Sequence, residues 1–331
     1  MNISQRIEAF VKLGQSISNI SIEDKQELFS RVYNENNWFT EENIIKSLNG
    51  ICSYLEKENL EIWLEKYDLT SPNSKKVGVI MAGNIPLVGF HDFLSILISG
   101  HSLMMKPSSQ DNALMNFVVK KLIEIEPEFE NRIKIVERLN EADAFIGTGS
   151  DNSAKYFRYY FGKKPHIIRQ NRSSIAVLNG KETVQELNIL GEDIFTYYGL
   201  GCRNVSKLLV PKGYNFIPLL DALKSYESVG DHHKYRNNYD YNKSIYLVNS
   251  EAHLDTGFLL VRESSDAVSP ISVLYYQQYA SETELNDLLK VNHEKTQCIV
   301  GHNYIPFGKA QMPQLWDYAD GVDTMAFLVN L

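Results

Sequence analysis

Cysteine is scarce in this chain. Only Cys52, Cys202 and Cys298 occur among its 331 residues. An odd and sparse set of three excludes a disulfide framework and favours a reducing compartment. A thiol is then available for chemistry, although composition does not say which of the three carries it.

The chain also lacks the run of about 18 consecutive apolar residues that a membrane-spanning helix needs. Its most apolar stretch, residues 77–100, is interrupted by Asn84, His91 and Asp92. Residues 1–10 contain no basic segment followed by an apolar one, so we expect no secretory signal. We therefore predict no membrane span and a cytoplasmic protein.

Basic tracts are missing as well. Lys and Arg number 33 against 41 Asp and Glu, which gives a formal net charge of −8. A net acidic chain without a basic cluster is poorly suited to nucleic acid, so we predict no nucleic-acid partner. Any site for an anionic ligand must then be local.

What the chain does contain is enough residues for about two domains, at roughly 150 residues each. Its 44% of apolar and 22% of charged residues are ordinary for a globular protein. Residues 2–70 carry apolar side chains at helical spacing, and Ser21 and Thr40 stand where helix caps are expected. Residues 71–76 form a turn-rich break.

From residue 77 onward, short apolar runs alternate with helical patterns, which predicts βαβ units and parallel sheets. Residues 237–242 are polar and aromatic, and we expect a loop there. The predicted helices are 86–99, 111–125, 151–160, 183–198, 215–227 and 282–291. The predicted strands are 77–82, 102–106, 133–136, 142–146, 166–170, 174–178, 205–210, 244–248, 257–262, 271–276 and 297–300.

Three segments at predicted strand or helix ends are candidates for chemistry. Gly149 and Ser150 follow a strand and open a helix, where a phosphate is favoured, although a tight turn explains them equally well. Asn84 interrupts an apolar strand-to-helix junction, and its amide is suited either to stabilise an oxyanion or to cap the helix. Cys202 follows two glycines after a helix, and it is either an exposed nucleophile or a small residue behind a helix end.

A metal site has little support. His232 and His233 are adjacent rather than spaced four apart, and no matching cluster of Cys, His or Glu accompanies them. We predict no metal. Cys52 on an apolar helix face and Cys298 in a short strand are interpreted as packing residues.

The order of five segments resembles the aldehyde dehydrogenase superfamily. Residues 77–86 (VGVIMAGNIP) resemble the segment with its oxyanion asparagine, here Asn84, and 97–108 (LISGHSLMMKPS) resemble its cofactor-binding segment. Residues 145–150 (FIGTGS) resemble its F-T-G-S turn, 199–210 (GLGCRNVSKLLV) its nucleophile motif, and 306–308 (PFG) its late PFGG turn.

Within that superfamily the chain most resembles the acyl-CoA reductase family, which includes the reductase subunit of the bacterial bioluminescence fatty acid reductase complex. The segments MAGNIP, YGLGCRNVS and the terminal DYADGVD carry this resemblance. It implies an α/β, aldehyde-dehydrogenase-like fold, with two Rossmann-type parallel-sheet domains and an N-terminal helical lead. We place the lead at 1–75, the nicotinamide-cofactor-binding domain at 76–178, and the catalytic cysteine domain with a C-terminal return segment at 179–331.

Departures from the superfamily pattern sharpen the prediction. Oxidising members use a glutamate to activate water, and Ile168 stands at that position and cannot act as a base. A second family glutamate, at the nicotinamide ribose, aligns with Asp266. NAD-preferring relatives often carry glutamate where this chain has Ser109, and serine removes the repulsion of a 2′-phosphate. The resemblance therefore implies NADPH as cofactor, with NADH as the alternative.

The implied activity is NADPH-dependent reduction of an acyl thioester to the aldehyde by an oxidoreductase. Cys202 is the predicted nucleophile and Asn84 the oxyanion donor. Cofactor binding is assigned to Lys106, Ser109, Gly149, Ser150 and Asp266, and the positive charge for anionic groups to Lys106 with Arg169 or Arg172. The alternatives are aldehyde oxidation in the CoA-acylating direction, non-redox acyl transfer or thioester hydrolysis through Cys202, and a silent binding protein. Predicted partners are acyl-CoA or an acyl-carrier substrate, an acyl-donor protein subunit, and further copies in a homo-oligomer.

Overall fold

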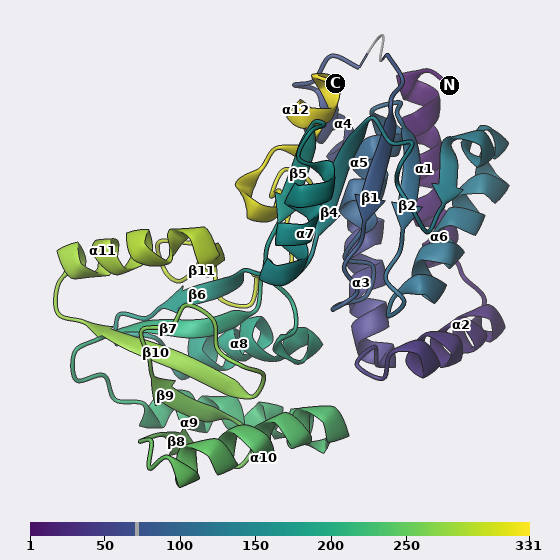
Figure 1. Ribbon diagram of the computed structural model, residues 1–331. Coiled ribbons are helices and arrows are strands. Elements are labelled where there is room, and N and C mark those ends of the chain that lie inside the picture. Colours follow the sequence, from purple (N-terminus) through teal and green to yellow (C-terminus); the bar gives the residue numbers. More distant parts are fainter. Residues whose placement is uncertain (70–72) are drawn as a thin grey trace. The chain divides into compact units, whose positions relative to one another are not determined.

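The computed structural model describes residues 1–69 and 73–331 (Figure 1). These residues divide into two compact units. The first unit comprises Met1–Gln170 and Gln314–Leu331, and the second comprises Asn171–Pro313. Of the predicted turn-rich break at 71–76, residues 71 and 72 lie outside the described residues, and so does residue 70 of the predicted helical region.

A five-stranded parallel sheet forms the centre of the first unit. Its strand order is β3-β2-β1-β4-β5, so the direction of strand addition reverses at β1. Ligands of such sheets bind outside the carboxyl ends of the strands at the reversal. The strands are β1 (Lys76–Ile80), β2 (Ser102–Lys106), β3 (Ile133–Ile135), β4 (Ala144–Thr148) and β5 (His166–Arg169).

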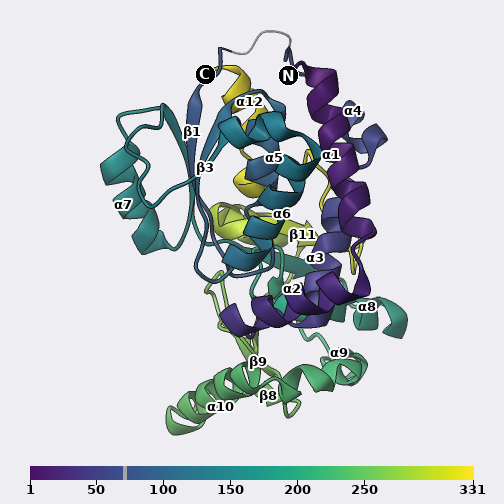
Figure 2. The same ribbon diagram turned by 90° about the vertical axis from the view of Figure 1, so that its right-hand side faces the viewer.

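Helices cover both faces of this sheet, with α5 and α6 on one side and α7 on the other (Figure 2). The predicted caps are confirmed, because the side chains of Ser21 and Thr40 accept backbone N–H groups at the starts of α2 and α3. The helices are α1 (Ile3–Ser18), α2 (Ile22–Glu35), α3 (Glu41–Tyr54), α4 (Lys57–Leu64), α5 (Phe90–Ile98), α6 (Asn112–Ile125), α7 (Asp151–Phe161) and α12 (Thr324–Val329), with a 3-10 turn at Pro127–Arg132.

The helical lead shares one hydrophobic core with α5 and α6 rather than folding apart from them. Phe10 of α1 lies edge-on to Phe93 of α5 and to Phe129, and all three are fully buried. The C-terminal segment joins the same core: Tyr318 accepts a 2.7 Å hydrogen bond from the Trp63 indole. Burial of this apolar surface is the main force that holds the first unit together.

The second unit contains a six-stranded sheet in the order β11-β6-β7-β10-β9-β8, parallel except for the β8–β9 pair. Its strands are β6 (Ser173–Val177), β7 (Val205–Pro211), β8 (Leu254–Asp255), β9 (Leu260–Glu263), β10 (Val273–Tyr279) and β11 (Thr296–Val300). Its helices are α8 (Val184–Phe195), α9 (Ile217–Leu223), α10 (His233–Val248) and α11 (Glu282–Asn292), with further 3-10 turns. The α/β class with two parallel-sheet units and a helical N-terminus is confirmed.

Two predicted elements are wrong. Residues 237–242, expected as a loop, and 244–248, expected as a strand, both lie in helix α10. Buried residues recur there at helical spacing, and Tyr239 and Tyr246 pack with residues of β9 and β10. Tertiary burial of this face overrides the strand propensity of the last residues. Helix α5 also begins later than expected, because Leu87 adopts a positive φ of 57° before it.

The units divide the chain at other places than the predicted domains. The sequence suggests a boundary at 178/179, whereas the units separate between Gln170 and Asn171, because β6 pairs with β7 and β11 of the second unit.

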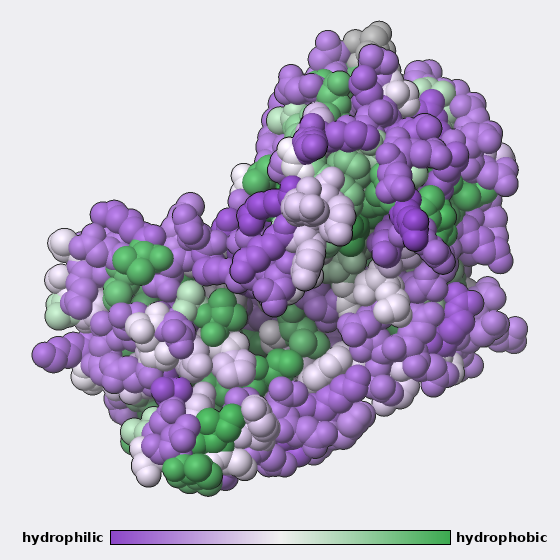
Figure 3. Space-filling view, viewed as in Figure 1, coloured by the Kyte–Doolittle hydropathy of each residue, from purple (hydrophilic) through white to green (hydrophobic). Residues whose placement is uncertain are grey.

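The described part of the chain contains no helix with both the length and the apolar character needed to cross a membrane. Figure 3 shows hydrophilic residues over most of the visible surface, with smaller apolar areas between them.

Candidate active site

Five of the predicted site residues gather at one edge of the first unit's sheet. Asn84 follows β1, Lys106 ends β2, Ser109 comes shortly after it, and Gly149 and Ser150 follow β4. All strands of this sheet are parallel, so their carboxyl ends meet at the same edge. Strands β2 and β4 lie on either side of β1, where the strand order reverses, so the loops after these three strands lie at the reversal.

The loop with Asn84 lies directly against the loop after β2. The backbone N–H of Met81 donates a 3.1 Å hydrogen bond to the carbonyl of Lys106. Gly83 packs so closely on Ser108 that a Cβ at this position would overlap the Ser108 side chain. A residue larger than glycine would push the two loops apart. Lys106 itself is exposed, and Asn84 is half-buried.

The turn after β4 is equally tight. The Ser150 side chain caps α7 by accepting the N–H of Ser153 at 3.2 Å. A Cβ on Gly149 would lie 2.8 Å from the Cβ of Ser153, so only glycine lets the chain enter the helix here. The N–H of Gly149 donates to the carbonyl of Arg169 at 3.3 Å. An exposed lysine, a helix N-terminus and this close turn at the sheet edge together fit a dinucleotide.

Arg169 does not supply the anion-binding charge that the sequence suggested. Its side chain is buried, with Nη1 2.6 Å from Asp92 Oδ2, and Nη2 donates to Thr324 Oγ1 at 2.8 Å. The guanidinium charge is thus neutralised inside the unit. Arg172 belongs to the second unit, where it donates to the carbonyl of Thr296 at 3.1 Å.

Cys202 lies in the second unit, between a 3-10 turn at Thr196–Gly199 and the start of β7. Tyr197 and Tyr198 have positive φ values of 54° and 57° in this turn. Such conformations cost about 1 kcal/mol or more per non-glycine residue and persist only where the surroundings hold them. The loop before Cys202 is therefore held in shape by contacts from outside it.

Asn204 provides those contacts. Its side chain is 1% exposed, and its Nδ2 group lies 2.8 to 3.2 Å from three backbone carbonyls, those of Asp193, Ile194 and Thr196. Its Oδ1 accepts the N–H of Gly201 at 2.8 Å. A single buried amide, two residues after Cys202, thus binds both the end of α8 and Gly201, the residue just before Cys202.

The other two cysteines occupy packed positions, and none of the three forms a disulfide. Cys52 accepts the Ser18 hydroxyl at 3.3 Å, and burial raises the pKa of its thiol. Cys298 lies in β11, with Sγ 3.0 Å from Ser174 Oγ. The same Ser174 hydroxyl donates to the carbonyl of Cys202 at 3.2 Å.

The late Pro306-Phe-Gly turn is fixed to helix α8. Asp193 is 1% exposed, and its carboxylate accepts the N–H groups of Gly308 at 2.6 Å and Ala310 at 2.9 Å. The Arg203 guanidinium donates to the carbonyl of Ala310. The cysteine loop and this turn are thereby joined through Arg203, which directly follows Cys202.

Asp266 lies on the exposed loop that follows β9, and a buried lysine holds that loop. Lys207 is fully buried, and its ammonium donates to the carbonyl of Ser265 at 3.0 Å. Burial lowers the pKa of Lys207, and the nearby Asp266 charge acts in the opposite direction. Ile168 lies half-buried on β5 of the first unit.

Sequence reasoning missed the roles of Ser174, Asp193 and Asn204. Asn204 stands inside the GLGCRNVS segment, so its position was visible, but no local pattern shows that its amide turns inward.

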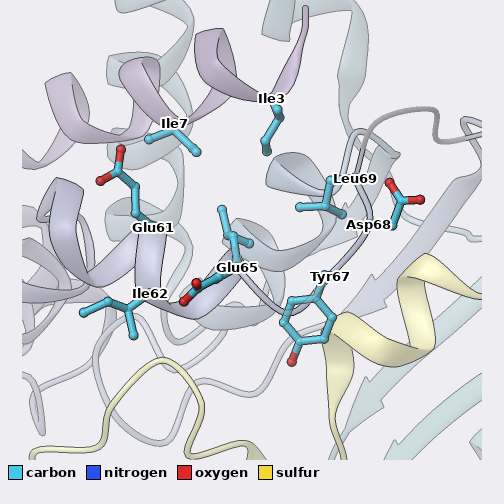
Figure 4. A pocket seen from close by; sticks show the side chains of 9 residues that line it. Ile3, Ile7, Glu61, Ile62, Glu65, Tyr67, Asp68 and Leu69 are labelled. Atoms are coloured by element: carbon cyan, nitrogen blue, oxygen red, sulfur yellow. The ribbon is translucent and has the colours of Figure 1, made fainter.

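Among the described residues no group of three or more His, Cys, Asp or Glu is arranged to hold a metal. A cavity of about 480 Å³ between α1 and α4 contains none of the predicted site residues (Figure 4).

The family model described as "LuxC: Acyl-CoA reductase (LuxC)" matches residues 40–217. That match covers more than half of the chain and includes Asn84, Lys106, Ser109, Gly149, Ser150 and Cys202. No curated protein matches the sequence.

Solved structures of aldehyde dehydrogenases share the fold. An NAD-dependent aldehyde dehydrogenase from Sinorhizobium meliloti has 12% identity and a TM-score of 0.68, over 91% of this chain and 70% of that chain. The Mycobacterium tuberculosis aldehyde dehydrogenase complexed with NAD+ has 13% identity and a TM-score of 0.65, over 91% and 73%. An NAD+ complex of a Bacillus cereus aldehyde dehydrogenase has 15% identity and a TM-score of 0.63, over 91% of this chain and 72% of that chain. Identities this low establish the fold alone.

Proposed function

Because this chain belongs to the acyl-CoA reductase (LuxC) family and is an oxidoreductase of acyl and aldehyde groups, we propose that it reduces an acyl thioester to the aldehyde with NADPH. The thioester is a fatty acyl-CoA or an acyl-carrier conjugate, and the reaction passes through a thioester on Cys202. The observation that carries the proposal is the fixed cysteine loop, in which the Asn204 side chain binds Thr196 and Gly201, both of which precede Cys202.

Cys202 acts as the nucleophile. Its thiolate adds to the carbonyl carbon of the substrate thioester, and the carbonyl oxygen becomes an oxyanion. The Asn84 amide and the Cys202 backbone N–H are the proposed donors to that oxyanion. When the tetrahedral species collapses, the bond to the CoA sulfur breaks, CoA leaves as a thiolate, and the acyl group stays on Cys202.

Reduction then needs a hydride, which NADPH would supply when bound. In this proposal Lys106 and Ser109 would hold the adenosine ribose and its 2′-phosphate, Gly149 and Ser150 the phosphates, and Asp266 the nicotinamide ribose. The same donors stabilise the second oxyanion, formed from the acyl-Cys202 carbonyl. Its collapse breaks the carbon–sulfur bond, releases the aldehyde and restores the Cys202 thiolate.

Ile168 supports reduction over hydrolysis. A carboxylate at this position activates water in oxidising relatives of the fold, and an isoleucine has no group that can take a proton. The acyl-Cys202 thioester therefore survives long enough to receive the hydride. Aldehyde oxidation in the CoA-acylating direction, the reverse of the same reaction, stays an alternative, and so does simple acyl transfer, which the following experiment separates from reduction.

The test is a panel of acyl-CoA substrates with NADPH or NADH, in which aldehyde, free CoA and NADPH consumption are measured together. We expect one aldehyde and one CoA for each NADPH consumed. Release of CoA without NADPH consumption over many turnovers would favour acyl transfer or hydrolysis instead. Cys202→Ala is expected to form no aldehyde and to take up no radioactive acyl label, whereas Cys52→Ala keeps both. Aldehyde formation by Cys202→Ala would overturn the nucleophile assignment.

An acyl-donor protein subunit and assembly into a homo-oligomer remain predictions from the family resemblance. Size-exclusion chromatography with light scattering measures the second directly. The first is tested by offering the acyl group on a carrier protein in place of CoA.

A further inference from the structure

The loop with Asn84 contains a strained residue. Leu87 is buried and has a φ of 57°, a left-handed conformation that a leucine adopts only when other groups enforce it. Two neighbouring bonds hold the loop near this point. The Ser47 hydroxyl donates to the carbonyl of Pro86 at 2.7 Å, and the N–H of Phe90 donates to the carbonyl of Leu87 at 2.9 Å.

The third bond comes from Asp111. Its Oδ2 accepts the N–H of Leu87 at 2.8 Å, and the side chain is 2% exposed. The backbone N–H of the same residue donates to the carbonyl of Ser108 at 3.1 Å, inside the loop that follows Lys106. Asp111 therefore touches the loop with Asn84 through its side chain and the loop with Lys106 and Ser109 through its backbone.

Asp111 does not do what an aspartate at this position usually does. It stands at the N-cap of α6, yet its carboxyl makes no capping hydrogen bond. The N–H of Ala113, which such a cap would satisfy, donates instead to Glu35 of α2 at 2.8 Å. The Asp111 side chain turns away from its own helix to reach Leu87, and its Oδ1 finds no hydrogen-bond partner among the described residues.

We propose that Asp111 is a positioning residue of the active site, which fixes the Asn84 loop against the cofactor loop after β2. The inference rests on the proposed function, because it assumes that Asn84 and Lys106 act on the same reaction. A carboxyl left buried with one unpartnered oxygen costs stability. The buried carboxyl has a use here, because the N–H of Leu87 is also buried and needs an acceptor that holds the strained turn.

Asp111→Leu and Asp111→Asn form the central comparison. Leucine has a similar size but accepts no hydrogen bond, whereas the asparagine amide oxygen can still accept the Leu87 N–H. The readouts are the single-turnover rate of CoA release at saturating acyl-CoA, the Kd for NADPH, and the rate at which iodoacetamide labels Cys202. Ser21→Ala, which removes a cap of α2, is the control for a loss of stability alone.

We expect Asp111→Leu to release CoA about 10²-fold more slowly, because a displacement of about 1 Å in a reacting group has an effect of this size. Asp111→Asn should recover most of the rate, and labelling of Cys202 should match the wild type in both. Ser21→Ala should keep the wild-type rate. If Asp111→Leu folds and releases CoA at the wild-type rate, the inference is wrong.

If Asp111→Leu does not fold, Asp111→Ser replaces it, because a serine hydroxyl is a good helix cap but is one atom too short for the present contact. The same loss of rate is then expected, and a wild-type rate would overturn the inference. The wild type and Cys202→Ala run in parallel. Failure of the wild type to release CoA overturns the proposed function, whereas a normal wild type with an unaffected Asp111→Ser overturns only the role of Asp111.

Discussion

Gly201 and Asn204 are joined by two hydrogen bonds, with Cys202 between them. The N–H of Gly201 donates to Asn204 Oδ1 at 2.8 Å, and the N–H of Asn204 donates to the carbonyl of Gly201 at 3.0 Å. The proposed nucleophile is therefore part of a closed turn whose shape a buried amide defines. A group that must attack a carbon along one direction benefits from such a fixed backbone.

Asn204→Ala is expected to destabilise the protein by about 3 kcal/mol, because it leaves several buried backbone groups without a partner, each at about 1–3 kcal/mol. The rate of acylation should fall even where the variant is folded, since the turn before Cys202 loses its shape. Urea unfolding followed by circular dichroism and single-turnover CoA release measure the two effects. An unchanged urea midpoint would show that the amide is dispensable.

Arg169 and Asp92 form a buried ion pair, and removing one partner should be worse than removing both. Arg169→Met leaves the Asp92 carboxylate buried without its charge partner, which typically costs about 3–5 kcal/mol. The double variant Arg169→Met with Asp92→Leu should regain much of that loss. Thermal unfolding of the two single variants and the double variant tests this. Equal losses in the single and double variants would contradict the coupling.

Asn84→Ala is expected to fold normally and to lose about 10²–10³-fold in rate, the usual effect of removing one oxyanion donor. The side chain is half-buried at the sheet edge rather than in the core, so its loss leaves no large cavity. Steady-state kinetics with NADPH and acyl-CoA measure the rate, and circular dichroism confirms the fold. A rate within a few-fold of the wild type would remove Asn84 from the mechanism.

Lys106→Ala is expected to raise the KM for NADPH by about tenfold or more, with a smaller effect on kcat, because charge-assisted hydrogen bonds contribute about 1.5–3 kcal/mol. The side chain is exposed, and the substitution keeps the Lys106 carbonyl that binds Met81. Lys134→Ala, on the same sheet at β3, is the matched control. An unchanged KM would argue against Lys106 as a cofactor residue.

Asp111 should make the stability of the protein depend on pH. Burial, together with the nearby Glu35 charge, raises the pKa of Asp111 from 3.8 to about 8 in the folded state, although the Leu87 N–H acts in the opposite direction. Because the folded state holds this proton and the unfolded chain releases it, the stabilisation is complete below pH 4 and is lost as pH rises towards 8. The slope is up to about 1.4 kcal/mol per pH unit. Urea unfolding at pH 5, 6 and 7 should show a shallower decline for Asp111→Asn than for the wild type, and parallel curves would refute the shift.

Much of the fold follows from local patterns. The caps at Ser21 and Thr40 and the alternation of strands and helices after residue 77 are properties of short segments, and the structure confirms them. The predicted strand at 244–248 is wrong because its residues belong to a helix whose tyrosines pack on residues of β9 and β10. A period of 3.6 shows only over a window longer than that strand.

The candidate site divides in the same way. The sequence by itself determined the class of residue at each strand end: an amide at 84, a lysine at 106, two glycines before Ser150 and a thiol at 202. Parallel strands then bring the first three loops to one edge of a sheet, as any such sheet must. Sequence order and strand polarity are enough for that conclusion.

The tertiary structure alone decided which charged and polar groups are buried and paired inside the protein. Arg169 is neutralised by Asp92, Asn204 turns its amide inward, and Asp111 leaves its helix cap to hold Leu87. The contacts of Arg169 and Asp111 join residues 77 and 24 positions apart in the chain, and no short pattern encodes them. Their physical basis is that a buried polar group must find a partner, and only the packed chain determines which groups are buried and which partners lie within reach.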